Sequence, residues 1–173
     1  DEVILAEAMQ SVGYSTGMIG KWHLGVREEF HPTNRGFDEY FGVIGWGSDY
    51  ADPTRDDVKR IIRATEKEQK TKPEDVAPWE RQGVKAVVRG SKPVIEDEYL
   101  TDALTRESVA FIRRQKDRPF FLYVPYTAVH QPLQITKKYY DRFPHIKDES
   151  RRIYAAMTSS MDDGIGAILD ALE

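Results

Sequence analysis

The sequence predicts an α/β fold with a mainly parallel sheet flanked by helices. Helical and strand patterns alternate along the chain, in the order helix, strand, charged segment, helix, strand, helix. The run "PFFLYVP" at 119–125 is apolar and lies between prolines, which is typical of a strand buried on both faces of a parallel sheet. Helices must then cover both faces of that sheet.

The first predicted elements are a helix in "DEVILAEAMQSVG", residues 1–13, and a strand in "YSTGMIG", residues 14–20. One face of this helix is apolar at helical spacing and is expected to face the core: Leu5, Ala8, Met9 and Val12. Gly13 suits the position just after a helix end. A helix, a tight turn and a strand make half of a βαβ unit.

Residues 51–96 differ in character, because they are highly charged and contain three prolines after Pro53. We expect a charged surface insertion here, with at most one short helix. A disordered linker between two domains is the alternative, but the apolar content on each side is small for two separate cores. The whole chain, 1–173, is therefore expected to belong to one domain.

Helical patterns flank the second strand. The segment 96–118 has apolar or small residues at helical spacing: Leu100, Ala103, Leu104, Ser108, Phe111 and Ile112. A short helix is predicted at 135–143. The segment 151–173 repeats apolar residues at spacings of three and four: Tyr154, Met157, Met161, Ile165, Ile168 and Leu172. It predicts a strong amphipathic helix.

Composition excludes several classes of protein. The 173 residues suffice for one ordinary domain, and 25 basic against 29 acidic residues give a net charge of −4, which argues against a nucleic-acid partner. No apolar run approaches the ~20 residues that span a membrane. With no cysteine, the chain has no disulfide and no thiolate nucleophile. Because helical patterns reach both ends without caps, we expect a piece of a larger protein.

The stretch "IGKWHLGV" at 19–26 carries the first candidate site. Lys21, Trp22 and His23 follow the predicted strand at its C-terminal end, where open α/β sheets bind ligands. In extended backbone, Lys21 and His23 would face one side while Trp22 packs on the other. Two converging donors suit an anion such as sulfate, phosphate or a carboxylate. A solvated lysine beside a loop histidine is the alternative, and the spacing alone favours neither.

The remaining candidates are single residues. His130 lies six residues beyond the predicted strand that ends at Val124, so it shares the sheet edge of Lys21 and His23. A lone histidine in such a place is more often structural than catalytic. Asp49 and Tyr50 either line a pocket rim, where they would bind substrate, or form a turn.

No metal site is expected in this chain. The one pair of adjacent aspartates in the last predicted helix is Asp162 and Asp163. Adjacent residues of a helix point about 100° apart, so these two carboxylates are poor joint ligands. We interpret them as solvated.

Five segments in order resemble the type I sulfatase family of the alkaline-phosphatase-like superfamily. They are "LAEAMQSVGYSTGMIGKWHLG", "NRGFDEYFG", "YLTDALTRESVAFI", "RPFFLYVPYTAVHQPLQ" and "YAAMTSSMDDGIGAILDALE". The likeness covers most of the chain outside 51–96, and "GKWHLG" with a downstream "PFFLYV" and histidine is its most specific part. The resemblance implies a partial alkaline-phosphatase-like (sulfatase) fold and hydrolysis of sulfate monoesters.

The resemblance also implies roles for three catalytic residues. Lys21 would contact the nucleophile and the sulfate oxygens. His23 would be the base whose proton abstraction releases sulfate, and His130 would hold a sulfate oxygen and help the leaving alcohol depart. Preorganised cations stabilise the charge that sulfuryl transfer places on oxygen, and a histidine titrating near neutral pH exchanges the proton.

Two groups that the resemblance implies have no residues here. The family's formylglycine nucleophile is made from a cysteine or serine upstream of residue 1, and its calcium ligands are acidic residues outside this segment. We therefore expect the central segment of a sulfatase catalytic domain, with calcium and formylglycine in the parent enzyme. The segment alone is expected to hold no cofactor and to be inactive.

Two other functions stay open from the sequence. The parent is alternatively a phosphodiesterase or phosphonate monoester hydrolase of the same superfamily, or the chain is a non-catalytic anion-binding scaffold. The expected partner is a sulfated small molecule or sulfated glycan, with no nucleic acid and no membrane span. Self-association is expected through truncated faces. The family is often periplasmic, secreted or lysosomal, and the sequence does not decide the compartment.

Overall fold

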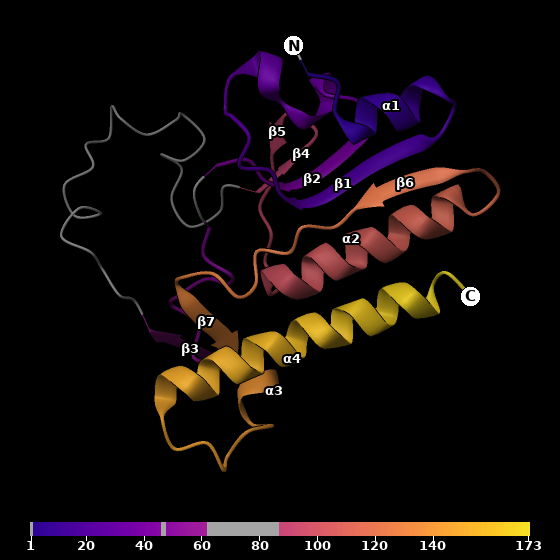
Figure 1. Cartoon of the computed structure of the whole chain (residues 1–173). Helices are drawn as coiled ribbons and strands as arrows, with labels where there is room; N and C mark the ends of the chain where they lie inside the picture. Colours follow the sequence, from indigo (N-terminus) through magenta and orange to yellow (C-terminus); the bar gives the residue numbers. More distant parts are fainter. Residues whose placement is uncertain (1, 46–47, 62–86) are drawn as a thin grey trace.

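The architecture follows from how the strands pair. The computed structural model describes residues 2–45, 48–61 and 87–173. Within these residues the main sheet has five strands in the order β5 (Lys92–Pro93), β4 (Val87–Arg89), β2 (Glu39–Val43), β1 (Ser15–Lys21) and β6 (Phe120–Tyr123) (Figure 1). The three strands β2, β1 and β6 are parallel, while β4 and β5 continue the sheet in antiparallel pairs. The predicted α/β class with a mainly parallel sheet is confirmed.

Helices cover both faces of this sheet. Their bounds are α1 Leu5–Ser11, α2 Leu100–Gln115, α3 Lys137–Tyr140 and α4 Glu149–Asp170, with the 3-10 turns η1 Glu28–Phe30 and η2 Pro32–Asn34. Figure 1 shows α1 on one side of the sheet and α2 on the other, with α4 packed beyond α2. Beside α4, a second sheet pairs β3 (Val58–Ile61) antiparallel with β7 (Leu133–Thr136).

The alternation of side chains along each strand gives the sheet a core on both faces. On the α1 side the buried cluster includes Ala6, Met18, Tyr40 and Val88. On the α2 side the neighbouring residues of the same strands join a larger cluster, which includes Ile19, Phe41 and Val87. Buried side chains therefore shield both faces of the sheet centre from solvent, as is typical of parallel sheets.

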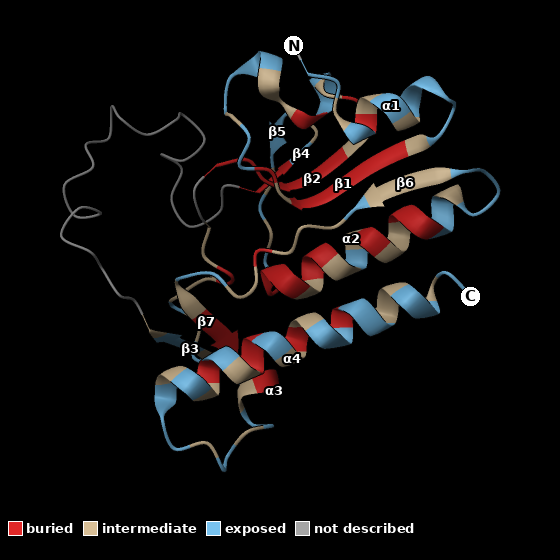
Figure 2. Ribbon diagram, viewed as in Figure 1, coloured by how far each residue is buried: buried red, intermediate tan, exposed pale blue. Residues whose placement is uncertain are grey.

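The helix α2 matches the sequence prediction fully. All the residues that define its predicted inner face are buried: Leu100, Ala103, Leu104, Ser108, Phe111 and Ile112. Figure 2 shows this buried stripe along α2, between the sheet and α4. The periodicity identified the buried face because α2 packs against the sheet on one side and α4 on the other.

The predicted inner face of α1 is wrong. Leu5 is 59% exposed and Val12 is 69% exposed, whereas Ala6 is buried. The chain at Gly36 packs against the backbone of the first helical turn so closely that a Cβ at Gly36 would lie 2.4 Å from the Glu7 nitrogen. An ion pair of 2.8 Å between Arg35 and Glu7 holds the same turn.

The last helix, α4, only partly follows the predicted face. Met157 is buried, but Tyr154, Ile165 and Leu172 are exposed. The buried positions lie on a neighbouring stripe: Ile153, Ala156, Met157, Ser160 and Gly164. The exposed apolar stripe of α4 runs toward the C-terminus, and Figure 2 shows how little of that end is covered.

The strand β6 is not buried on both faces as its apolar sequence predicted. It forms one edge of the main sheet, with β1 as its neighbour, and Tyr123 is 47% exposed. An apolar run identifies a strand that suits a buried place, but the neighbours of the strand decide its burial.

Parts of the segment 51–96 belong to the core. Val87 and Val88 of β4 are buried in the two cores, and Ala51 is also buried. Residues 62–86 of that segment, with the short helix expected there, lie outside the described residues. No helix among the described residues is long and apolar enough to cross a membrane.

Candidate active site

The C-terminal end of β1 places Lys21 beside the segment that follows β6. The backbone N–H of Lys21 donates to the Pro125 carbonyl oxygen at 2.8 Å. Gly20 makes this approach geometrically feasible, since its φ is 144° and a Cβ there would lie 2.1 Å from the same oxygen. The C-terminal end of β1 therefore lies beside the chain that leaves β6. Along that chain, His130 comes five residues after Pro125.

Trp22 anchors the end of β1 to the core. The residue is buried, its N–H donates to the Val43 carbonyl at 2.9 Å, and its indole Nε1–H donates to the Phe30 carbonyl at 2.8 Å. Its ring meets the Phe37 ring edge-on, with 6.1 Å between centroids. The expectation that Trp22 packs and fixes the local geometry is confirmed.

His23 departs from the extended backbone that the sequence reading assumed. Its φ is 59°, in the left-handed region, while its N–H donates to the Ile44 carbonyl at 3.0 Å. For a residue other than glycine this conformation costs on the order of 1 kcal/mol. The simple alternation of Lys21 and His23 on one face therefore stops at His23, whose side chain is exposed.

Partial burial changes the character of the Lys21 ammonium. Its pKa lies below the ordinary lysine value because burial removes water from the charged form. A cation that has lost part of its hydration gains more from an anionic partner than a fully hydrated one. Lys21 thus suits the binding of an oxyanion at the sheet edge.

His130 sits in a tight turn that fixes its ring. Its N–H donates to the Thr127 carbonyl at 3.0 Å, and its ring Nδ1 lies 2.7 Å from the Gln131 carbonyl oxygen. A carbonyl only accepts, so Nδ1 carries the proton. In the neutral ring Nε2 is then the acceptor, and in the protonated ring it is a donor. The exposed ring thus has its Nδ1–H bonded to the Gln131 carbonyl and its Nε2 available for another contact.

Tyr50 holds this turn in place from the other side of the core. Its side chain is 2% exposed, and its hydroxyl donates to the Thr127 carbonyl at 2.6 Å and lies 3.1 Å from both the N and O atoms of His130. Burial raises the pKa of the hydroxyl to about 12. The buried hydroxyl bonds to backbone groups, and the role of Tyr50 in binding substrate stays a prediction.

Asp49 forms an ion pair with an arginine of the same chain. Its carboxylate pairs with the Arg60 guanidinium at 3.0 Å and is mostly buried. Burial raises the pKa of this carboxyl, with Arg60 acting in the opposite direction and the charge of Asp52 adding to the rise. Asp49 was predicted from the sequence to bind substrate. The Asp49 carboxylate oxygen that pairs with Arg60 would have to leave that ion pair before it could contact a substrate.

A positioning residue that the sequence reading missed is Gln134. Its side chain is fully buried, and its Oε1 accepts the Tyr50 N–H at 2.7 Å while its Nε2 donates to the Ala51 carbonyl at 3.3 Å. Nothing in a single sequence marks such a glutamine, because its partners lie more than eighty residues away.

The described residues do not gather a metal-binding set. No group of three or more histidine or acidic side chains in 2–45, 48–61 and 87–173 has the geometry to hold a metal ion. The calcium that the family resemblance implies therefore has no fitting ligand set among them. The candidate groups are a partly desolvated lysine at the end of β1, a histidine two residues after it, and His130 in the turn that follows β6.

Comparisons with known proteins point to one family. A family model described as Sulfatase matches residues 1–173. The chain is 34% identical to arylsulfatase J of Mus musculus and 30% identical to N-acetylgalactosamine-6-sulfatase of Homo sapiens. The alignments cover 100% and 99% of this chain but 26% and 29% of those proteins. The chain thus spans less than a third of the length of these relatives.

Solved structures agree with the sequence comparisons. The crystal structure of Ps i-CgsB in complex with k-i-k-neocarrahexaose matches with a TM-score of 0.74 and 34% identity, over 96% of this chain and 35% of that chain. The PsFucS1 sulfatase from Pseudoalteromonas sp. matches with a TM-score of 0.65 at 20% identity, over 98% and 35% of the two chains. The second likeness concerns the fold alone.

Proposed function

This chain belongs to the sulfatase family, and from that premise we propose that it supplies part of an active site that hydrolyses sulfate monoesters. The observation that carries the proposal is the junction of β1 and β6, where the Lys21 N–H donates to Pro125 five residues before His130. In α/β sheets the carboxyl ends of parallel strands are the usual place for ligands.

Lys21 is proposed to grip the sulfate oxygens. Sulfuryl transfer leaves negative charge on the non-reacting oxygens and on the leaving oxygen, and a fixed cation lowers the energy of that charge distribution. The lowered pKa of Lys21 supports this role, because a partly desolvated ammonium gains most when an anion arrives.

The two histidines are proposed to handle protons. His130, with Nδ1–H bonded to the Gln131 carbonyl, would hold a sulfate oxygen and donate from Nε2 to the departing alcohol. His23 would take a proton from the nucleophile side and so release sulfate. Its left-handed backbone sets its side chain apart from the strand that carries Lys21.

The nucleophile and the metal are proposed to come from other parts of the protein. The chain contains no cysteine for conversion to formylglycine, and the described residues fit no calcium ion. The complete protein, which is this chain together with the flanking parts that its relatives carry, would contain both. The groups named above would bind sulfate and move protons within it.

A sulfated glycan is the proposed class of substrate. One relative is named for a 6-sulfated N-acetylgalactosamine, and one similar structure contains a neocarrahexaose. The first name indicates a sulfated sugar, and the second indicates an oligosaccharide. The fold likeness to these proteins extends over nearly all of this chain, which supports the same class here.

The proposal is tested by replacing Lys21 in the complete protein. With Lys21→Met, kcat/KM for 4-nitrophenyl sulfate is expected to fall by about a hundredfold or more, because an oxyanion contact is lost. Lys116→Met removes the same charge from an exposed position at the opposite end of the sheet and should leave the rate unchanged. Unchanged kinetics with Lys21→Met would contradict the proposed role.

A second substrate separates the two hydrolase classes. The complete protein is expected to hydrolyse 4-nitrophenyl sulfate faster than bis(4-nitrophenyl) phosphate. A clear preference for the phosphodiester would move the protein to phosphoryl transfer, with Lys21 and His130 still at the reacting oxyanion.

A further inference from the structure

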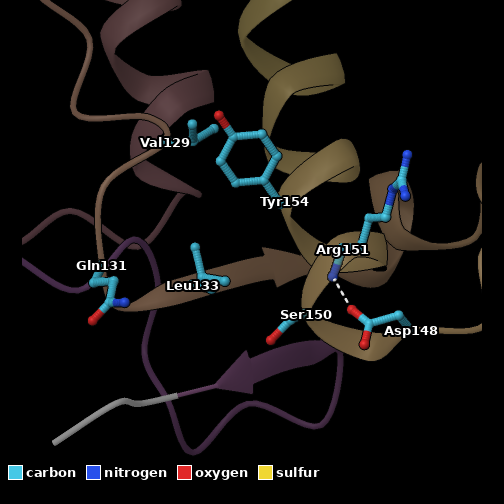
Figure 3. A pocket seen from close by; sticks show the side chains of 7 residues that line it. All are labelled: Val129, Gln131, Leu133, Asp148, Ser150, Arg151 and Tyr154. Carbon is cyan, nitrogen blue, oxygen red and sulfur yellow. Dashed lines mark hydrogen bonds between the residues drawn. The ribbon is translucent and has the colours of Figure 1, made fainter.

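A cavity of about 410 Å³ opens beside His130, between the start of β7 and the first turns of α4. Figure 3 shows the side chains that line it: Val129, Gln131, Leu133, Asp148, Ser150, Arg151 and Tyr154. Three of these residues come from the turn and strand that carry His130, and four from the start of α4 or the residue before it. The cavity is therefore built from two elements that β7 and α4 bring together.

The cavity adjoins the proposed reacting centre. Val129 and Gln131 are the two chain neighbours of His130, and both line it. Neighbouring Cα atoms across a trans peptide lie about 3.8 Å apart, so the lining reaches the backbone on either side of His130. Tyr50 fixes the same turn through its bonds to Thr127 and His130, so the spacing between the cavity and His130 is held.

The lining combines one aromatic ring with two aliphatic side chains. The Tyr154 ring is 50% exposed, and it lies with Leu133 and Val129 around the hollow in Figure 3. Small-molecule sites combine such apolar and aromatic surface with a few placed polar groups. The C–H face of a pyranose ring suits the face of an exposed tyrosine, because the ring face is apolar and weakly negative.

The polar groups of the lining are open to a ligand. The Arg151 guanidinium, the Gln131 amide and the Ser150 hydroxyl bond to no other described residue. Asp148, in contrast, is used as the N-cap of α4 and accepts the Arg151 backbone N–H at 2.8 Å. The next residue, Arg152, is also used, since it donates to the Tyr140 carbonyl and lies 3.7 Å from that ring.

We propose that this cavity, the His130 cavity, binds the sugar next to the sulfated one in an oligosaccharide substrate. The inference rests on the function proposed above and adds a binding site to it. Tyr154 stacks on the neighbouring sugar ring, and Arg151 forms charge-assisted hydrogen bonds with an anionic substituent of that sugar, such as its own sulfate. Gln131 and Ser150 supply hydrogen bonds to the sugar hydroxyls.

The test compares a long and a short substrate of the complete protein. For Arg151→Ala and Tyr154→Ala, KM for a sulfated hexasaccharide of carrageenan or chondroitin is expected to rise about tenfold each, the loss of one good contact. KM and kcat for 4-nitrophenyl sulfate should not change, because that ester does not reach the His130 cavity. Both side chains are exposed, so the fold is expected to tolerate the changes.

A matched control is Arg118→Ala. This change removes the same charge from an exposed residue just before β6, at the opposite end of the sheet from His130. It should leave both substrates unaffected. Equal effects of Arg118→Ala and Arg151→Ala on the hexasaccharide would overturn the inference, since they would report net charge rather than a site.

A binding measurement keeps this inference separate from the proposed function. Calorimetric titration of the complete protein with the same hexasaccharides needs no turnover. Binding that Arg151→Ala weakens, in a protein that hydrolyses no sulfate ester, would support the site and overturn the catalytic proposal. Hydrolysis of 4-nitrophenyl sulfate without hexasaccharide binding, or with binding that neither variant alters, would overturn the site and leave the proposed function standing.

Discussion

The hydroxyl of Tyr50 joins two segments that are eighty residues apart in the chain, and it does so at the turn of His130. In Tyr50→Phe the Thr127 carbonyl loses the tyrosine hydroxyl as a donor and keeps the His130 N–H. The expected cost is about 0.5–1.5 kcal/mol of stability, the range for one hydrogen bond. A lower kcat for sulfate ester hydrolysis is expected as well, because the imidazole is no longer held.

The matched control for this change is Tyr99→Phe. Tyr99 is also buried, its ring stacks on Tyr50, and its hydroxyl donates to the Gln134 carbonyl at 3.0 Å without touching the His130 turn. Both variants should lower the midpoint of thermal unfolding, and only Tyr50→Phe should lower kcat. An equal loss of kcat in the two variants would show a general stability effect and remove Tyr50 from the site.

At the scale of single residues the sequence was most informative about Lys21 and His130. Lys21 ends one apolar run and His130 follows six residues after the next, which predicts the C-terminal ends of two strands, and the structure pairs those strands, β1 and β6, in parallel. The sequence did not indicate how deeply Tyr50 is buried, because the burial of a tyrosine depends on segments far away in the chain. The catalytic roles of Lys21 and His130 remain predictions.

Between elements, β1 lies very close to the chain after β6. Gly20→Ala would put a Cβ 2.1 Å from the Pro125 carbonyl oxygen at a φ of 144°. We expect a loss of several kcal/mol in stability, on the order of 3, because the strands must separate or the backbone must strain. The matched change is Gly166→Ala on α4. Apart from the backbone of the helix itself and the chain neighbours, no atom would lie within 4 Å of the added Cβ.

The two glycine variants are expected to move the midpoint of thermal unfolding in opposite directions. Gly166→Ala should stabilise by about 0.5–1 kcal/mol, since alanine restricts the unfolded chain and favours helix. A midpoint for Gly20→Ala equal to that of the unchanged protein would mean that the two strand ends lie further apart than described.

An ion-pair cluster joins β4 to α2. Glu107 accepts from Arg89 through two bonds of 2.8 Å and from Arg106 at 3.0 Å. The Arg89 bonds are the main reason that the pKa of the Glu107 carboxyl lies below its usual value. The stability that this adds is present above the unfolded pKa of about 4.3 and is lost as pH falls through the lower folded value.

Glu107→Gln is therefore expected to destabilise the protein at neutral pH and not in strong acid. The expected difference is about 1 kcal/mol at pH 7, since Arg89 is half exposed and solvent weakens the pair. Thermal unfolding measured from about pH 7 to pH 3 should show the two proteins converging toward the acid end. A constant difference over that range would mean that the charge of Glu107 does not matter.

Elements that contact neighbours along their whole length were predictable, and elements at the margin were not. Periodicity identified α2 with its whole buried face. It chose the wrong face for α1, which has few neighbours, and it could not reveal that β6 lies at a sheet edge. The pairing of β3 with β7 joins residues more than seventy positions apart, and no local pattern encodes such a contact.

As a whole molecule the chain leaves large apolar surfaces uncovered. The exposed apolar side chains outside the His130 cavity lie mainly on α1 and the segments beside it, and at the C-terminal end of α4 and just after it: Val3, Leu5, Val12, Ile165, Leu169 and Leu172. Surfaces of this kind are usually covered by other protein. The edge of β6 adds backbone groups that could pair with another strand.

The 173-residue chain expressed alone is accordingly expected to self-associate and to hydrolyse no sulfate ester. Sedimentation velocity should show oligomers, and 4-nitrophenyl sulfate should not be turned over, because the proposed nucleophile lies elsewhere. A monomer with measurable sulfatase activity would contradict both expectations. The complete protein, assayed beside it, provides the positive control.

Trp22 gives the candidate site an optical signal of its own. Its buried indole donates to the Phe30 carbonyl and lies between Lys21 and His23 in the chain. Indole fluorescence is sensitive to exclusion of water and to a protonated imidazole nearby. With the other two tryptophans of the chain changed to phenylalanine, emission from this single ring would report oxyanion binding and proton movement as they occur, without any added dye.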